Sequence, residues 1–236
     1  MQVLSEKEKA QRAAIHDMFA GIANRYDLLN HTLSLNIDKR WRRRVSAILK
    51  DILANPDADI LDIACGTGDL AIELASKGNA AVTGTDFCRP MLEIAAKKLP
   101  KVALVEADAM ALPFADNTFD AVTIAFGLRN LPNFANGLRE MHRILRPGGR
   151  LVILEFSKTW LPGFGAMFNF YFSHILPRIG GAVSRSRSAY EYLPDSVSKF
   201  PDQQALAELV GQCGFSDVNY VDLTGGIAAV HTGTKA

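Results

Sequence analysis

The sequence predicts an α/β fold: a doubly wound, mostly parallel sheet. Between residues 59 and 156, short apolar segments alternate with segments of helical periodicity, as in sheets whose strands are joined by helices. The first of these strands ends in the glycine turn Cys65-Gly-Thr-Gly68, where a helix follows. Asp86 closes the second strand, 20 residues after Gly66, the spacing at which a carboxylate can bind a ribose. A nucleoside-containing cofactor is therefore expected.

Two helices are predicted before the sheet, over 8–23 and 37–53. The second has one apolar face, made by Trp41, Val45, Ile48, Leu49 and Ile52. Basic side chains cover much of the remaining surface of this helix: Lys39, Arg40, Arg42, Arg43 and Arg44. They form either a solvated surface or a surface that contacts an anionic membrane, where each is worth about 1 kcal/mol.

The alternating pattern sets the elements of the parallel region. Strands are predicted near 59–64, 81–86, 102–106, 119–125 and 150–156, and helices near 69–77, 89–98 and 134–145. We expect Arg146-Pro-Gly-Gly149 to end the last of these helices, because proline cannot continue a helix and glycine accepts the left-handed conformation.

After Ser157 the pattern changes. Residues 158–200 form an aromatic insert with Trp160, Phe164, Phe168, Phe170, Tyr171 and Phe172. The insert is either a helix packed on the sheet edge or a cover over an apolar substrate pocket. A final helix over 202–213 precedes two strands near 217–222 and 226–233, which Thr224-Gly-Gly226 joins in an antiparallel hairpin.

A single domain over 1–236 with a seven-stranded sheet is therefore predicted. Its parts are N-terminal helices (1–53), a cofactor-binding core (54–157), the insert (158–200), and a C-terminal helix and hairpin (201–236).

Composition excludes several classes of protein. The formal net charge is +1, which gives no global basic field for nucleic acid. The cysteines, Cys65, Cys88 and Cys213, lack the spacing of a metal site or a disulfide framework, which favours a reducing cytoplasm and no metal. No apolar run reaches the roughly 18 residues of a membrane span, and the start of the chain has no apolar signal core.

The glycine turn has a specific chemistry. Gly66 and Gly68 let the backbone bend and approach a ligand without a Cβ in the way. Asp69 is placed to cap the following helix. Asp62 lies in a buried strand, where a carboxylate is costly unless paired, so we expect it to face the ligand pocket or to accept backbone hydrogen bonds.

The turn alone fits a nicotinamide cofactor as well as S-adenosylmethionine. Asp108 follows the third strand, where its carboxylate and the next N–H, of Ala109, can bind an adenine edge; the alternative is a role in capping its own loop. With Arg146-Pro-Gly-Gly149 and a terminal hairpin in place of a separate substrate domain, the chain resembles class I S-adenosylmethionine-dependent methyltransferases.

A narrower resemblance covers residues 17–233. It rests on five stretches, which occur in the family's order: Tyr26-Asp-Leu-Leu-Asn30, Phe126-Gly-Leu-Arg-Asn130, the segment from Arg143 to Ser157, Tyr192-Leu-Pro-Asp-Ser196 and Leu223-Thr-Gly-Gly-Ile-Ala-Ala-Val-His231. These stretches resemble the ubiquinone/menaquinone biosynthesis C-methyltransferase family. One departure is Asp38, which stands where the family usually has a histidine three residues before the tryptophan; we expect a structural role there.

The resemblance implies methyl transfer from S-adenosylmethionine to a ring carbon of a lipid-tailed quinol, in ubiquinone or menaquinone biosynthesis. It implies a cytoplasmic protein with weak peripheral contact at the inner face of a membrane. A homodimer, or membership of a quinone-biosynthesis assembly, is left open. The alternatives are a methyltransferase of this fold acting on another apolar small molecule, a nicotinamide dehydrogenase, and a cofactor-binding scaffold within a membrane-associated biosynthetic assembly.

The reaction requires a nucleophilic ring carbon, and deprotonating a ring hydroxyl provides one. Phenols titrate near ~10, so a base or a stabilising charge is needed. Arg129 and Asn130 are the catalytic candidates, because they follow the fourth strand at the end of the sheet where ligands gather. For Arg129 the alternative is an ion pair with Asp120 or a helix cap, and His174 is the alternative base. The resemblance implies the following cofactor-binding residues: Tyr26, Asp62, Gly66, Thr67, Gly68, Asp86, Phe87, Asp108, Ala109 and Ala125.

Overall fold

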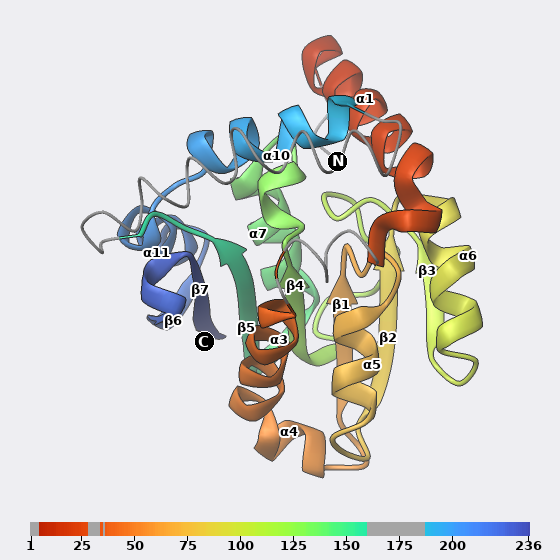
Figure 1. Ribbon diagram of the computed structural model, residues 1–236. Helices are drawn as coiled ribbons and strands as arrows, with labels where there is room; N and C mark the ends of the chain where they lie inside the picture. Colours follow the sequence, from red (N-terminus) through yellow and green to blue (C-terminus); the bar gives the residue numbers. More distant parts are fainter. Residues whose placement is uncertain (1–4, 28–33, 35, 160–186) are drawn as a thin grey trace.

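The computed structural model describes residues 5–27, 34, 36–159 and 187–236. Its centre is a seven-stranded sheet with the order β3-β2-β1-β4-β5-β7-β6 (Figure 1). The strands are β1 (Asp59–Ile63), β2 (Ala81–Asp86), β3 (Ala103–Glu106), β4 (Phe119–Ala125), β5 (Leu145–Phe156), β6 (Phe215–Leu223) and β7 (Ala228–Lys235).

Strands β1 to β5 are parallel, and β7 is antiparallel to both β5 and β6. The turn Thr224–Gly226 joins β6 to β7, with Gly225 in the left-handed region at φ 68°. The predicted doubly wound sheet with its C-terminal antiparallel hairpin is therefore confirmed.

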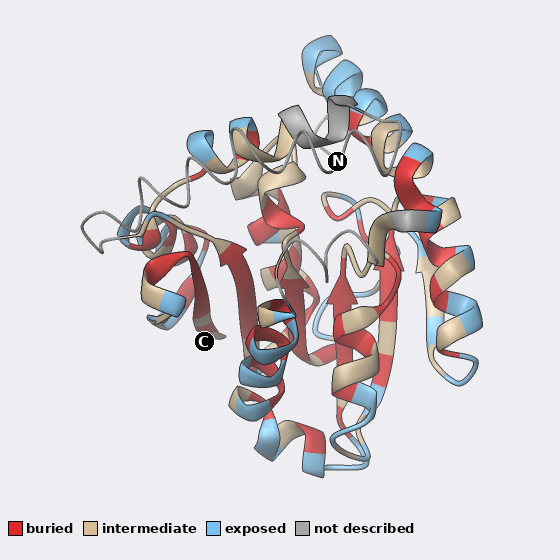
Figure 2. Cartoon of the chain, viewed as in Figure 1, coloured by how far each residue is buried: buried red, intermediate tan, exposed pale blue. Residues whose placement is uncertain are grey.

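Helices cover both faces of the sheet, and the strands at its centre consist mainly of buried residues (Figure 2). One face packs against α3 (Ile37–Ile48), α4 (Lys50–Ala54) and α5 (Asp69–Ala75). The other face packs against α7 (Phe134–Ile144) and α11 (Gln203–Gln212). Alternate residues of β1 enter the two cores, since Ile60 packs in the first and Leu61 and Ile63 pack in the second.

Two helices lie across the carboxyl ends of the parallel strands. They are α1 (Glu6–Ile22) and α10 (Arg187–Lys199), shown in red and light blue at the top of Figure 1. Helix α1 begins in a capping box formed by Ser5 and Glu8, and it packs beside α6 (Arg89–Lys98). The position of α1 and α10 places them over the edge of the sheet where a ligand is expected.

Two boundaries differ from the prediction. The predicted helix 37–53 is two helices that meet at Leu49, where ψ is 13°. The hydrophobic pattern does not indicate this break, because Leu49 at the break and Leu53 after it are both buried in the same core. Strand β5 begins at Leu145 instead of 150, because Leu145 pairs with Phe119 before a register shift. Gly148, which has a left-handed φ of 79°, therefore lies at this irregularity within β5 and does not end the preceding helix.

None of the helices in the described part of the chain combines the length and hydropathy needed to cross a membrane.

Candidate active site

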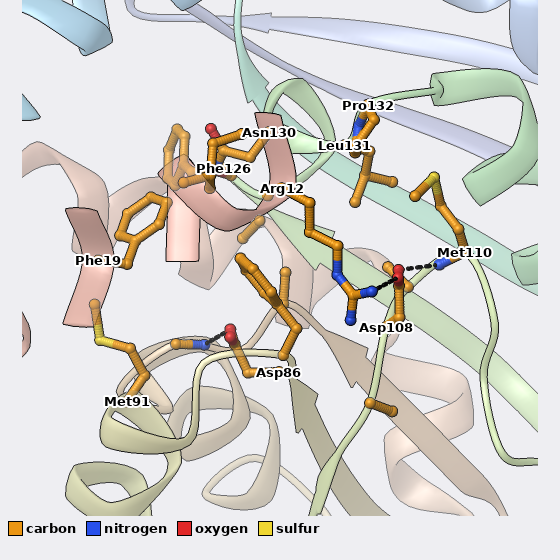
Figure 3. A pocket seen from close by; sticks show the side chains of 18 of the residues that line it. Arg12, Phe19, Asp86, Met91, Asp108, Met110, Phe126, Asn130, Leu131 and Pro132 are labelled. Carbon is orange, nitrogen blue, oxygen red and sulfur yellow. Dashed lines mark hydrogen bonds and ion pairs between the residues drawn. The ribbon is translucent and has the colours of Figure 1, made fainter. Parts of the chain in front are cut away.

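A cleft opens at the carboxyl ends of β1, β2 and β4, beneath α1 (Figure 3). It encloses about 720 Å³, part of which is open to solvent. Helix α1 and the turn after it contribute Arg12, Ile15, Phe19 and Tyr26, and α6 contributes Met91. The strand ends and their loops contribute Ala64, Gly66, Asp86, Phe87, 107–110, 125–127 and 130–132.

The best-defined part of the cleft is the contact between the glycine turn and Asp86. The Gly66 N–H donates to Asp86 Oδ2 at 2.9 Å, and the Cys88 N–H donates to Oδ1 at 2.8 Å. Burial raises the pKa of Asp86, while these backbone donors lower it. Gly66 has φ 56°, and a Cβ there would meet only the Tyr26 ring at 3.9 Å. The turn thus presents open backbone next to a fixed carboxylate, as a ribose site requires.

Gly68 has a packing role in addition to the one expected. Its φ is 88°, and a Cβ there would lie 2.6 Å from Leu99 Cδ1 and 3.3 Å from Ala95 Cβ. The glycine therefore allows the start of α5 to pack against α6. Gly68 is itself the N-cap residue, so the prediction that Asp69 occupies the cap position was wrong; Asp69 is the first residue of the helix.

Asp62 is buried beneath the turn, with 1% of its surface exposed. The Thr123 hydroxyl donates to Oδ1 at 2.8 Å, whereas Oδ2 has no hydrogen-bond partner among the described residues. Burial raises the pKa of Asp62 to about 7, and the Thr123 hydrogen bond and the charge of Arg42 oppose this rise. Asp62 does not line the cleft, but it leaves one buried acceptor unsatisfied next to the turn.

Asp108 lies on the opposite wall and makes two contacts (Figure 3). Its Oδ1 accepts the Met110 N–H at 2.9 Å, which is the loop-capping role considered from the sequence. Its Oδ2 pairs with Arg12 NH1 at 3.2 Å, so the side chain of Arg12 extends from α1 across the cleft. Arg12 was not predicted, because a single basic residue on a helix carries no motif.

Arg129 is held by a buried ion pair. Its Nη1 donates to Glu155 Oε1 at 2.7 Å and to the Phe126 carbonyl at 2.6 Å, and its guanidinium lies over the Phe156 ring. The Arg129 and Glu155 side chains are 7% and 1% exposed. Burial raises the pKa of Glu155, and the charge of Arg129 lowers it. The suggested partner Asp120 was wrong: Asp120 binds Arg146 and the Asp59 N–H.

Asn130, unlike Arg129, lines the cleft. Its amide is fixed at both ends: Nδ2 donates to the Phe126 carbonyl at 3.2 Å, and Oδ1 accepts the Tyr192 hydroxyl at 3.0 Å. Tyr192 belongs to α10 and had no assigned role from the sequence. The available signal was its place in Tyr192-Leu-Pro-Asp-Ser196, one of the stretches that carried the family resemblance.

A polar network ties the N-terminal segment to the glycine turn. The Thr67 hydroxyl donates to Asp27 Oδ1, and Lys98 Nζ donates to Asp27 Oδ2 at 2.8 Å. Lys98 also donates to Asp69 Oδ1 at 2.6 Å. Thr67 is thereby turned away from the cleft, which it does not line.

Arg42 extends this network into α3. It pairs with Asp38 and, at 3.4 Å, with Asp69. Asp38 also accepts the Ser34 hydroxyl, so the residue that replaces the family's histidine is buried in structural contacts. Arg42 is only 7% exposed, so its assignment to an exposed basic surface was wrong.

The predicted site residues fall into two groups. Those that line the cleft are Tyr26, Gly66, Asp86, Phe87, Asp108, Ala109, Ala125 and Asn130. Those that lie behind it are Asp62, Thr67, Gly68 and Arg129. His174 and most of the aromatic insert, 160–186, lie outside the described residues. Within the described residues, no group of three or more His, Cys, Asp or Glu side chains is placed to hold a metal.

The sheet order and this cleft define the class of protein: a Rossmann-like methyltransferase fold. A solved S-adenosylmethionine-dependent methyltransferase from Aquifex aeolicus shares the fold, with a TM-score of 0.59 and 18% identity over 80% of this chain and 88% of that one. A methyltransferase-like structure from Thermotoga maritima, described as a possible histamine N-methyltransferase, also has a TM-score of 0.59, with 19% identity over 93% and 100% of the two chains.

The sequence comparisons identify the family. The model of the ubiE/COQ5 methyltransferase family matches residues 4–235. The ubiquinone/menaquinone biosynthesis C-methyltransferase UbiE of Geobacter sp. (strain M21) is 49% identical over all of both chains. The demethylmenaquinone methyltransferase of Deinococcus radiodurans is 46% identical over 98% of this chain and 95% of that one. The chain belongs to the ubiE/COQ5 methyltransferase family, and the predicted resemblance and enzyme class are confirmed.

Proposed function

We propose that this protein transfers a methyl group from S-adenosylmethionine to a ring carbon of a lipid-tailed quinol, in ubiquinone or menaquinone biosynthesis. The observation that carries the proposal is a single cleft that joins the Asp86–Gly66 contact to the Asn130 amide. One end of the cleft suits a nucleoside and the other suits a ring oxygen. The names of the relatives supply the substrate class.

The residues present fit this cofactor. Asp86 keeps acceptor capacity for ribose hydroxyls beyond its two backbone donors, and Gly66 leaves room beside it. Asp62 Oδ2 is a buried acceptor with no partner in the described chain, but Asp62 lies behind the turn and does not line the cleft. When bound, S-adenosylmethionine supplies an activated methyl group on a positively charged sulfur.

At the other end, we propose that Asn130 contacts the ring oxygen with its second amide N–H. Tyr192 and the Phe126 carbonyl hold that amide in one orientation, which is a form of preorganisation. Apolar side chains from α1 and from the loop after β4 keep water from this part of the cleft: Phe19, Leu131 and Pro132.

We propose that Arg129 is a positioning residue. Its guanidinium is neutralised by Glu155, which reduces its field at a substrate. It also donates to the Phe126 carbonyl that holds Asn130. Phe126 has a φ of 56°, which few residues other than glycine adopt, so the loop needs such support.

We also propose a cytoplasmic protein that makes weak contact with an anionic bilayer. Four basic residues of α3 remain exposed: Lys39, Arg40, Arg43 and Arg44. All three cysteines are free, in keeping with a reducing compartment.

The test is a methyl-transfer assay with S-adenosylmethionine and a prenylated benzoquinol or naphthoquinol, read by the mass of the product. Asn130→Ala should reduce kcat with little change in cofactor affinity, while the matched control Asn79→Ala, exposed just before β2 at the far end of the sheet, should behave like the parent. Cofactor binding without methylation of either quinol would favour another apolar substrate. Tight binding of NADH in place of S-adenosylmethionine would reject the proposal.

A further inference from the structure

A second cavity is lined by residues of α1 and by Tyr192 of α10. These two helices cross the top of the sheet (Figure 1). Its volume is about 500 Å³. The wall formed by α1 carries Ala14, Ile15, Met18 and Gly21, and Tyr192 of α10 forms part of the opposite wall. The nearer end of this cavity adjoins the first cleft, because Ile15 lines both.

The α1 wall is a stripe of apolar and small residues. Positions 14, 15, 18 and 21 share one face of the helix, since side chains three and four residues apart are neighbours. Among the described residues, Gln11 and Asp17 also line the cavity, and both are exposed, so their polar ends can stay in water. Ala14 and Gly21 are exposed as well, so the cavity is an open groove. Such a surface suits a long, flexible hydrocarbon and offers little to a polar ligand.

We infer that this cavity binds the polyprenyl tail of the quinol substrate. The inference rests on the proposed function and adds a second subsite to it. Tyr192 lines the cavity and donates its hydroxyl to Asn130, so the cavity begins one hydrogen bond away from the proposed ring site. A tail attached to a ring at Asn130 can therefore pass Tyr192 and Ile15 and lie between the helices, which leaves the first cleft to the cofactor and the ring.

Two substitutions on α1 fill the cavity without disturbing the core. A Cβ at Gly21 would have no neighbour within 4 Å, and the position is helical, so Gly21→Leu is expected to fold. Ala14→Leu projects from the same wall. The matched control is Ala13→Leu, which adds the same atoms at an exposed position of α1 that lines neither cavity.

The experiment compares kcat/KM on two quinols with the same ring, one with a long polyprenyl tail and one with a single isoprene unit. The Gly21→Leu/Ala14→Leu double variant should lose about 10-fold or more on the long-tailed substrate, which corresponds to about 1.4 kcal/mol. Its kcat/KM on the short-tailed substrate, its affinity for S-adenosylmethionine and its melting temperature should match those of Ala13→Leu.

Equal losses on the two substrates, or no loss on either, would overturn the tail subsite while leaving the methyltransferase function intact. If the unsubstituted protein methylates neither quinol, the proposed function fails and the tail subsite fails with it. If the parent methylates the short-tailed quinol only, the tail has no place in the molecule and the inference is wrong.

Discussion

Replacing Arg129 by alanine tests whether this residue supports the site or acts on the substrate. The substitution removes the charge that faces Glu155, whose side chain is 1% exposed, and it frees the Phe126 carbonyl. Breaking a buried ion pair by removing one partner typically costs about 3–5 kcal/mol, because the other charge stays buried without compensation. We therefore expect Arg129→Ala to be strongly destabilised.

The expected loss of stability can be stated as a decrease in melting temperature. In a protein of this length, 1 kcal/mol corresponds to roughly 2–4 °C, so the loss should amount to roughly 6–20 °C. The loss should also depend on pH. Burial raises the pKa of Glu155 and Arg129 lowers it, so without Arg129 the folded-state pKa rises further above the unfolded value. Such a group supports the folded state at low pH and loses that support as pH rises. The destabilisation should therefore be smaller near pH 5 than near pH 8.

The assay measures melting by calorimetry and methyl transfer well below each melting temperature. The matched variant is Arg129→Ala/Glu155→Gln, in which neither charge remains; it should recover most of the lost stability, because replacing both partners of a buried pair is often nearly neutral. If Arg129→Ala instead melts within about 2 °C of the parent and still loses 10²-fold in kcat, the scale of a lost oxyanion donor, the ion-pair argument is wrong and Arg129 acts on the substrate.

Three further predictions concern other parts of the chain. Asp86→Ala should weaken S-adenosylmethionine binding by about 1.5–3 kcal/mol, measured by calorimetry, because a charged acceptor is lost; unchanged affinity would contradict the ribose assignment. Asp62→Asn should gain stability relative to the parent as pH rises from about 4 to 7. Over that interval the parent loses stability, because its buried carboxyl has a folded-state pKa above the unfolded value and must ionise, whereas asparagine does not titrate. If the melting temperatures of the two proteins differ by the same amount at every pH, the prediction is wrong. Arg43→Gln/Arg44→Gln should reduce flotation with anionic liposomes at low salt and leave the melting temperature unchanged, because both side chains are exposed. Arg42→Gln should lower the melting temperature, because it breaks the buried ion pair with Asp38. If both variants change flotation and melting temperature to the same extent, the assignment of Arg43 and Arg44 to a membrane-binding surface and of Arg42 to a structural ion pair is wrong.

The arrangements that the sequence predicted correctly are those fixed by short covalent spacing. A parallel strand, a glycine turn and the next strand in register bring Gly66 and Asp86 to the same edge of the sheet, whatever the rest of the molecule does. The hairpin of β6 and β7 is equally local, since only four residues, 224–227, separate its strands.

Contacts between distant segments could not be predicted in this way. Arg129 and Glu155 meet because β4 and β5 are neighbours in register, and Arg12 meets Asp108 because α1 crosses the sheet edge. Neither pairing leaves a periodic signal in the sequence. The burial of Arg42 is a different case: positions 38, 42, 45 and 49 share one face of α3, so the same periodicity that identified Val45 and Leu49 already placed Asp38 and Arg42 on the buried side.

The polar network from Thr67 through Asp27 and Lys98 to Asp69 has a thermodynamic consequence. It joins the segment after α1 to the turn beside which the cofactor is expected, so the docking of that segment and the order of the turn share one set of contacts. Coupling of this kind is reciprocal. Whatever steadies the turn also holds the N-terminal segment in place, and whatever loosens that segment weakens the hold on the ligand. Binding of a ligand in the cleft should therefore slow amide hydrogen exchange in α1.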